Sequence, residues 1–257
     1  ARFEAEGRAA ARVKHDHIVA VTDAGAEGDR LFLAMEFLEG ESLRERLKAR
    51  GRLSVQEAVD LLLPVCDAVA TAHRAGVIHR DLTPANLFLE RRRDGDAPKV
   101  LDFGIAKLRA QAEATGHTRS GALLGTPFFM SPEQLSAQRM AITRRSDIYA
   151  LGVTLYEILA GRRPFDESST HLMIQRIQQD DPLPPSRYCD AVPRALEIIC
   201  LKAMERDPEH RYATAAEFAD DLEHYLKDEP IMARSAGTMT RLIKFMRRRR
   251  VAVGVTA

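Results

Sequence analysis

The feature that most constrains this chain is a polar segment, His-Arg-Asp-Leu-Thr-Pro-Ala-Asn at residues 79–86, followed at residues 102–104 by Asp-Phe-Gly. The two segments supply two carboxylates and one amide, from Asp81, Asp102 and Asn86. A carboxylate can accept the proton of a hydroxyl group, and carboxylate and amide oxygens are ligands that Mg²⁺ accepts. The pattern therefore predicts a site that holds a metal ion beside a reacting hydroxyl. Either segment alone would also fit an ordinary turn or strand end.

Together the segments match the catalytic loop H-R-D-L-x-x-x-N and the metal-binding D-F-G of protein kinases, in the order that phosphoryl transfer requires. From about Arg2 to about Lys227 the chain resembles the eukaryotic-like serine/threonine protein kinases of bacteria. The resemblance implies transfer of the γ-phosphate of ATP to Ser or Thr hydroxyls of protein substrates in signal transduction. It also implies an α+β, bilobal kinase fold, with only part of the N-terminal β lobe present and a mainly α-helical C-terminal lobe.

The resemblance implies a role for each polar residue of the loop. Asp81 would accept or orient the proton of the incoming hydroxyl, and Asn86 and Asp102 would bind Mg²⁺, or alternatively Mn²⁺. Thr83 stands where the family usually has a lysine that contacts the γ-phosphate. A threonine hydroxyl carries no charge, so this departure affects the expected rate more than the expected reaction. His79 is expected to hold the loop through hydrogen bonds rather than to act as an acid or base.

The nucleotide-binding part of the site is less complete. An apolar run ending at Met35 predicts a strand. The resemblance implies that Met35 is the gatekeeper and that the Glu36 carbonyl and the backbone groups of Leu38 meet adenine. An ordinary strand-to-loop exit is the alternative. Segment 2–11 resembles the helix that carries a glutamate partner for the ATP-binding lysine, and Glu6 occupies that position. The Gly-rich loop and that lysine are absent from the sequence. We therefore expect an N-terminally truncated fragment, inactive by itself; a pseudokinase or docking module without turnover is the alternative.

Other residues match the scaffold of the family. Glu133, in Ser-Pro-Glu at residues 131–133, is expected to form an ion pair with Arg211, and Asp147 is expected to anchor the catalytic loop. Thr126 resembles the threonine that contacts the catalytic aspartate and favours Ser and Thr acceptors over Tyr. These matches speak against a small-molecule phosphotransferase of related fold.

The segment between Gly104 and Gly125 is polar and irregular, and it contains hydroxyl side chains. Arg80 is the family's marker for control by phosphorylation, because a phosphate on this segment would give its guanidinium a bidentate partner. The candidate autophosphorylation sites are Thr115, Thr118 and Ser120. Hydroxyl groups are also common by chance in exposed loops, which is the alternative interpretation.

Periodicity predicts several helices and strands. Ser-Val-Gln-Glu at residues 54–57 and Thr-Ala-Ala-Glu at residues 214–217 are capping boxes, each followed by apolar residues at helical spacing. Pro64 lies within the first of these helices and is expected to bend it. Residues 148–159 are apolar on almost every face, which predicts a buried helix, and the run at residues 18–21 predicts a short strand.

Charge is unevenly distributed along the chain. Seven of the 38 Lys and Arg residues fall in residues 231–257, which contain no acidic residue, so the first 230 residues carry 31 basic and 37 acidic side chains and a net charge of −6. Four arginines at residues 247–250 precede an apolar run, a pattern typical of the cytoplasmic flank of a transmembrane helix. We therefore expect a partial N-lobe at 1–38, a C-lobe at 39–228, a basic juxtamembrane linker at 229–250 and the start of a possible transmembrane helix at 251–257.

These observations also predict location and partners. Three cysteines without C-x-x-C spacing, Cys66, Cys189 and Cys200, are typical of reduced thiols in the cytosol. We expect a cytoplasmic catalytic domain in a parent protein anchored in the membrane by a helix that begins near Val251. A solvated basic tail is one alternative. Nucleic-acid binding is another, but we expect none, because the tail lacks interleaved aromatic residues and a recognised binding fold.

Overall fold

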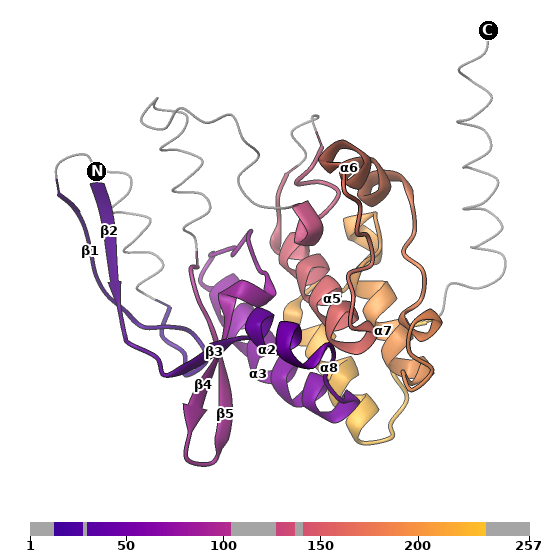
Figure 1. Ribbon diagram of the computed structural model, residues 1–257, viewed down its shortest axis with the longest axis horizontal. Helices are drawn as coiled ribbons and strands as arrows, with labels where there is room; N and C mark the ends of the chain where they lie inside the picture. The colour runs from indigo at the N-terminus through magenta and orange to yellow at the C-terminus, as the bar shows by residue number, and fades with distance from the viewer. Residues whose placement is uncertain (1–12, 28–29, 104–126, 137–140, 235–257) are drawn as a thin grey trace, which may run out of the picture.

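The computed structural model describes residues 13–27, 30–103, 127–136 and 141–234 of the chain (Figure 1). The strands lie on one side of the molecule and the helical body lies on the other (Figure 1). Strands β1 (Val21–Glu27) and β2 (Arg30–Met35) pair antiparallel, with a register shift near the start of β1. Strands β3 (Gly40–Ser42), β4 (Leu87–Arg92) and β5 (Gly95–Val100) form a second antiparallel sheet in the order β3-β4-β5.

A short segment before β1 connects the two sheets. Val19 donates its backbone N–H to the Val100 carbonyl at 3.0 Å, and Val100 donates its own N–H to the His17 carbonyl at 2.8 Å. The prediction of a strand at residues 18–21 is wrong, because β1 begins only at Val21 and Ile18 forms a single parallel bridge to Val100. Ile18 and Val19 are buried here in a connector rather than in a strand.

The helical body contains α2 (Leu43–Arg50), α3 (Val55–Arg74), α5 (Arg144–Ala160), α6 (Thr170–Gln179), α7 (Arg194–Ala203) and α8 (Ala215–Leu226). Short 3₁₀ turns lie between them, at η1 (Pro84–Asn86), η2 (Pro127–Phe129), η3 (Pro185–Arg187) and η4 (Pro208–His210). The expected α+β fold with a mainly helical larger part is confirmed. The segment that contains the 79–86 loop leaves α3 and returns through η1 into β4, so the loop lies where the helical body meets the second sheet.

Side-chain caps fix where two of these helices begin. At the start of α3, the Ser54 hydroxyl accepts from the Glu57 N–H at 3.2 Å, and the Glu57 carboxylate accepts from the Ser54 N–H at 2.8 Å, so the predicted capping box forms. Pro64 lies inside α3 and does not end it. At the start of α8 only half of the predicted box forms. Thr214 accepts from the Glu217 N–H, but the Glu217 carboxylate binds the N–H of Ala213 instead.

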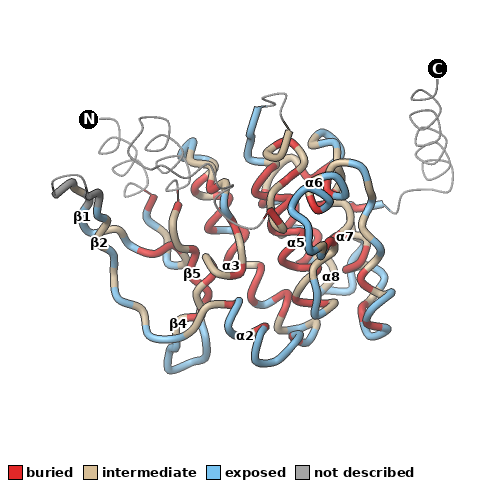
Figure 2. Tube along the Cα trace, turned by 45° about the horizontal axis from the view of Figure 1, so that its top comes forward, coloured by how far each residue is buried: buried red, intermediate tan, exposed pale blue. Residues whose placement is uncertain are grey.

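Helix α5 lies at the centre of the core. Nearly all of its residues from Ser146 to Leu159 are buried, whereas the residues of the β1–β2 pair whose burial is described are exposed or only partly buried (Figure 2). Helix α5 packs against α3 and α7, and Gly152 faces the C-terminal end of α7. A Cβ atom added at Gly152 would lie 2.8 Å from the Ala203 Cβ and 2.9 Å from the Met204 Cγ. The contact between these two helices therefore requires glycine.

The chain after α8 is bound back onto the helical body. The Asp221 carboxylate is fully buried and accepts hydrogen bonds from the Tyr212 hydroxyl at 2.8 Å, the Met232 N–H at 2.5 Å and the Ala233 N–H at 2.8 Å. These bonds hold residues 232–233, near the start of the 229–250 segment, against α8. Within the described ranges, every helix is too short or too polar to cross a membrane.

Replacement of Gly152 with Val is expected to lower the free energy of unfolding by about 2 kcal/mol, because the added methyl groups overpack the contact between α5 and α7. Urea unfolding followed by circular dichroism would measure the change. Arg144→Val, at an exposed position in the first turn of the same helix, is the control and should have little effect. Equal effects of the two substitutions would contradict the assigned packing.

Candidate active site

The 79–86 loop is anchored by one buried carboxylate on α5. The Asp147 side chain is 1% exposed and accepts from the backbone N–H of His79 (Oδ2, 2.8 Å) and of Arg80 (Oδ1, 2.8 Å). The same carboxylate is 2.7 Å from Nε2 of His73, near the end of α3. Hydrogen bonds to an ionised group are stronger than those between neutral groups, and a buried carboxylate requires them. Asp147 therefore fixes the start of the loop against both α5 and α3.

Two residues of the site have a left-handed backbone. Arg80 has φ of 70° and Asp102 has φ of 60°, a conformation that costs non-glycine residues free energy and persists where surrounding contacts impose it. At Arg80 those contacts are on both sides, since its N–H donates to Asp147 and its carbonyl accepts from Nε2 of Gln134 at 2.7 Å. The conformation turns the chain sharply just before Asp81.

His79 connects the loop to the segment that carries Asp102. Its Nε2 is 2.7 Å from the Leu101 carbonyl, and its Nδ1 is 3.3 Å from the backbone N–H of Asp81. Because the Leu101 carbonyl can only accept and the Asp81 N–H can only donate, the proton lies on Nε2 and Nδ1 is the acceptor. The Phe103 ring packs edge-on against the imidazole, with ring centroids 4.7 Å apart. Both nitrogens of His79 are thus occupied by structural hydrogen bonds.

Asn86 makes the second connection to the same segment. Its backbone carbonyl accepts from the Leu101 N–H at 2.8 Å, so both backbone groups of Leu101 are bonded to the loop. Its side-chain Nδ2 donates to the Asp81 carbonyl at 2.7 Å and lies 3.4 Å from the Asp81 Oδ2. With Nδ2 occupied in this way, the amide oxygen Oδ1 is the atom left to bind a ligand. These bonds bring Asp81, Asn86 and Asp102 to one place.

The donor atoms of this cluster fit a hard cation. Asp81 is exposed and Asn86 and Asp102 are partly exposed, so a bound ligand can reach them. Among the described residues, no group of three or more His, Cys, Asp or Glu side chains gathers as a metal site made of protein ligands alone. Magnesium usually binds one or two protein oxygens together with phosphate oxygens of a substrate, and Asp102 with the Asn86 Oδ1 provides that number.

Thr83 lies two residues after Asp81 and immediately precedes η1. Its carbonyl accepts from the Asn86 N–H at 2.9 Å, and its hydroxyl makes no capping bond to the turn. The side chain is partly exposed. The hydroxyl is therefore available to a ligand beside Asp81, although it carries no charge.

The end of β2 lies opposite Asp102. Met35 is 39% exposed and shares the wall of a small cavity with Asp102 and Phe103, which places the expected gatekeeper next to the Asp-Phe-Gly segment. Glu36 pairs with Ala20 through its backbone N–H, and Leu38 is partly buried two residues further on. The expected gatekeeper and the expected metal ligand therefore line one small cavity.

Glu133 and Arg211 form a buried ion pair. The two Nη atoms of Arg211 each donate to one oxygen of Glu133 at 2.8 Å, and the Ser146 hydroxyl donates to Oε1 at 2.8 Å. Both side chains are at most 2% exposed. Burial raises the pKa of Glu133, but the hydrogen bonds and charge of Arg211 and the Ser146 hydroxyl outweigh it, so the pKa is lowered overall. The pair fixes residues 131–133 to α5 and to the segment before α8.

Some expected site residues lie outside the described part of the chain. These are Glu6, Thr115, Thr118, Ser120 and Thr126. Conversely, sequence reasoning did not assign contacts to three residues of the observed network, which are His73, Gln134 and Lys99. The sequence position of Lys99 could have indicated a buried partner, because it is a charged residue in the buried end of a strand.

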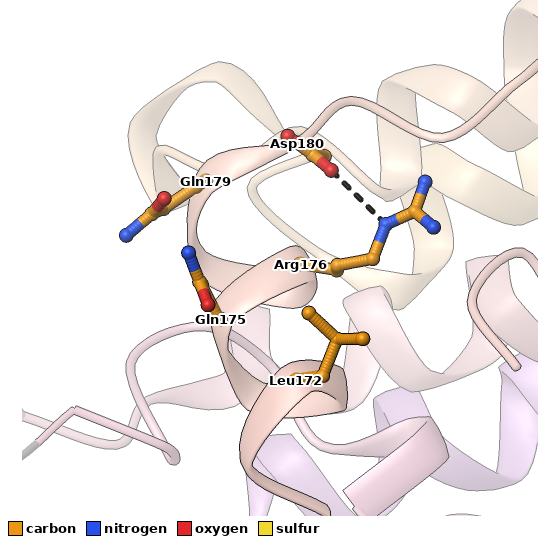
Figure 3. Close-up of a pocket in the computed structure, with 5 residues that line it drawn as sticks. All are labelled: Leu172, Gln175, Arg176, Gln179 and Asp180. Carbon is orange, nitrogen blue, oxygen red and sulfur yellow. Dashed lines mark hydrogen bonds and ion pairs between the residues drawn. The ribbon is translucent and has the colours of Figure 1, made fainter. Parts of the chain in front are cut away.

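A surface cavity of about 300 Å³ lies elsewhere, on α6 (Figure 3). An ion pair joins Nε of Arg176 to Oδ2 of Asp180 at 3.1 Å along its wall (Figure 3). The lining residues all belong to α6 or its C-terminal cap: Leu172, Gln175, Arg176, Gln179 and Asp180. None of them belongs to the 79–86 loop or to residues 101–103, so this cavity is separate from the candidate active site.

Comparison with known proteins agrees with the geometry. The family model "Protein kinase domain" matches residues 1–225. The chain is 39% identical over 225 residues to the serine/threonine-protein kinase PknB of Mycobacterium leprae, covering 86% of this chain and 35% of that protein. It is 43% identical over 224 residues to Pkn1 of Myxococcus xanthus, covering 86% and 31%, and 38% identical over 222 residues to PrkC of Bacillus subtilis, covering 86% and 33%. The chain thus spans about a third of the length of these relatives.

A solved structure has the same fold. The kinase domain of PknI from Mycobacterium tuberculosis superposes with a TM-score of 0.68 at 27% sequence identity. The superposition covers 87% of this chain and 77% of that one. The described strands and helices therefore follow the bilobal kinase arrangement.

Replacement of Glu133 with Gln is expected to lower the free energy of unfolding by about 3 kcal/mol at neutral pH, because it leaves the buried Arg211 uncompensated. The carboxylate stabilises the fold fully above its unfolded pKa of about 4.3, and this contribution is lost as pH falls through its lower folded pKa. The difference between the two proteins should therefore shrink on acidification. Urea unfolding at several pH values would measure it.

Lys227→Met is the control for that measurement, because it breaks an exposed Lys–Glu pair on α8. This substitution should move the unfolding midpoint little at any pH. A difference between the wild-type and Glu133→Gln proteins that stayed constant down to acidic pH would contradict the role assigned to the carboxylate.

Proposed function

Because this chain belongs to the protein kinase domain family, and within it to the eukaryotic-like serine/threonine kinases of bacteria, we propose that the protein transfers the γ-phosphate of ATP to Ser and Thr hydroxyls of protein substrates. The observation that carries the proposal is the double connection of Leu101 to the 79–86 loop, which brings Asp81, Asn86 and Asp102 together. The chain covers about a third of its relatives, so the proposal concerns the whole protein rather than this segment alone.

Asp81 is the residue that we assign to the acceptor hydroxyl. Its side chain is exposed, while its N–H and carbonyl are held by His79 and Asn86. A carboxylate fixed through its backbone can orient a hydroxyl and accept its proton without reorganising. His79 holds this geometry and is not available as a base, since both of its nitrogens are bonded.

Asp102 and the Asn86 Oδ1 are the atoms that we assign to Mg²⁺, with Mn²⁺ as an alternative. When bound, the cation would neutralise charge on the phosphate oxygens of ATP. The two residues hold their positions through Leu101, whose backbone groups are bonded to His79 and Asn86. We propose that the Thr83 hydroxyl donates a hydrogen bond to a phosphate oxygen, which would stabilise developing charge less than a lysine would.

We assign the adenine edge to the end of β2. The backbone carbonyl of Glu36 and the backbone groups of Leu38 would bind adenine, with Met35 behind it. The position of Met35 beside Asp102 supports this assignment, because the base and phosphate ends of one nucleotide must lie in one cleft. By resemblance, Glu6 would pair with the ATP-binding lysine of the family.

Regulation would act through the segment after Asp102. We propose Thr115, Thr118 and Ser120 as autophosphorylation sites and Arg80 as the residue that binds the added phosphate. Nε of Arg80 is buried and has no hydrogen-bond partner among the described residues, which supports a role for its guanidinium in binding an anion. Thr126 is proposed to favour Ser and Thr acceptors.

Residues 1–38 are proposed as part of the N-lobe and 39–228 as the C-lobe. The proposed basic linker, 229–250, begins where Asp221 binds the chain to the helical body. We propose that this linker leads into a membrane anchor that starts near Val251, so that the kinase domain lies in the cytoplasm and nucleic acid is not a partner. Four arginines before an apolar run support this arrangement.

Asp81→Asn in the full-length protein is expected to lower phosphate transfer from γ-labelled ATP by about 10²–10⁴-fold, because the amide cannot accept the hydroxyl proton. Autophosphorylation and a generic protein acceptor would both be assayed, and peptide mapping would locate the phosphate. Asp220→Asn, on the exposed surface of α8, is the matched control and should retain activity. Undiminished labelling in a folded Asp81→Asn protein would exclude Asp81 as the catalytic residue. A wild-type protein that binds partners but transfers no phosphate would favour the pseudokinase alternative.

Fractionation of cells that express the full-length protein would test the anchor. A spanning helix predicts that the protein stays in the membrane pellet after a wash in about 1 M salt, which screens electrostatic attraction to a Debye length of about 3 Å. Release by the wash would instead indicate binding through the basic linker alone. A protein found entirely in the supernatant before the wash would exclude both.

A further inference from the structure

A partly buried ion pair joins the two parts of the chain to which we assign nucleotide binding. Nζ of Lys99 is 2.5 Å from Oε1 of Glu36, and the lysine side chain is only 8% exposed. Lys99 belongs to β5, three residues before Asp102, whereas Glu36 immediately follows Met35 at the end of β2. The pair therefore connects the proposed adenine edge to the strand that leads to the proposed metal ligand.

Neighbouring hydrogen bonds make this connection stiff. Oε1 of Glu36 also accepts from the Ala20 N–H at 2.8 Å, and the Glu36 N–H donates to the Ala20 carbonyl at 2.9 Å. Next to Ala20, Val19 donates to the carbonyl of Val100, which follows Lys99 in β5. The contacts form a closed ring through three segments, so a shift of the β2 end relative to β5 must break at least one of them.

The charges of the pair are compensated within this ring. Burial raises the pKa of Glu36, but its bonds to Lys99 and to the Ala20 N–H outweigh this effect, so the pKa is lowered overall and the carboxylate is ionised at neutral pH. A buried ammonium group is costly unless it is paired, and an apolar residue would fill the end of β5 without that cost. The ion pair is therefore better explained by a requirement for position than by packing.

We propose that Lys99 and Glu36 are positioning residues for the nucleotide, and that their ion pair sets the spacing between the adenine edge at residues 36–38 and the metal ligand Asp102. The inference rests on the proposed function, because it requires a nucleotide that reaches both segments. It goes beyond that function by assigning the Glu36 side chain, as distinct from its backbone, and Lys99 to substrate positioning.

The physical reason is that a nucleotide binds these two segments with two linked ends. When one end is bound, the effective concentration of the other end at its subsite depends on how well the spacing of the subsites matches the ligand. A change in spacing should therefore weaken the intact nucleotide while leaving ligands that occupy a single subsite unaffected. A residue with only a structural role would not produce this pattern.

Lys99→Met in the full-length protein tests the proposal, because methionine fills a similar volume without the charge. Calorimetric titration with MgADP should show about tenfold weaker binding, while adenosine and magnesium tripolyphosphate bind as they do to the wild type. In steady-state assays KM for ATP should rise about tenfold with kcat changed less than about threefold. Lys227→Met, which breaks an exposed Lys–Glu pair on α8, is the matched control and should leave all of these values unchanged.

Glu36→Gln is the second variant, since its amide oxygen can still accept from the Ala20 N–H while the charge is lost. It occupies a partly exposed position, so it decides the test if Lys99→Met does not fold. It should give the same pattern, and the double variant should lose no further affinity, because both substitutions remove one interaction. Unchanged or tighter MgADP binding in a folded variant overturns the proposal, as does equal weakening of adenosine alone. A wild type that binds no MgADP would instead overturn the proposed function itself.

Discussion

The carboxylate of Asp147 is the interaction on which the rest of the structure depends. It belongs to the most deeply buried helix, α5, yet its partners are the backbone of His79 and Arg80 and the ring of His73. A buried charge without such partners would destabilise the fold by several kcal/mol. The core can therefore tolerate Asp147 only when the loop is in place, and the loop keeps its left-handed turn only when the core is formed. Asp147 thus couples the packing of the helical body to the geometry of the site.

Buried polar contacts position the reactive groups, and the reactive groups themselves remain accessible. Asp81 is exposed, but its backbone is held by His79 and Asn86. The ion pair of Glu133 and Arg211 is another buried contact that positions the chain. It fixes residues 131–133 and does not face solvent. A substitution in the buried set should therefore alter activity through geometry, and one in the exposed set through chemistry.

Local patterns predicted the elements that depend on local interactions. The capping box at Ser54 marked the start of α3, and the uniformly apolar run within residues 148–159 marked α5 as buried. The prediction of a strand at residues 18–21 was wrong, because apolar residues in a connector and in a strand follow the same pattern. Motif spacing and family resemblance identified the cluster around Asp81, but the lobe boundaries and the roles of its residues remain predictions.

The missed contacts have a common cause. His73 and Asp147 are 74 residues apart, Gln134 and Arg80 are 54 apart, and Lys99 and Glu36 are 63 apart. Each pair is formed by tertiary packing, which no local periodicity encodes.

The two bonds at Leu101 restrict how Asp102 can reorient. The Leu101 carbonyl and the Asp102 nitrogen belong to one planar peptide group, and His79 fixes the direction of that plane. A change in the backbone direction at Asp102 must then come from rotation about its own φ and ψ, where the chain already occupies a left-handed well. Escape from that well would release conformational strain, so the contacts on either side of the peptide group, rather than the preference of Asp102 itself, keep the aspartate in this conformation.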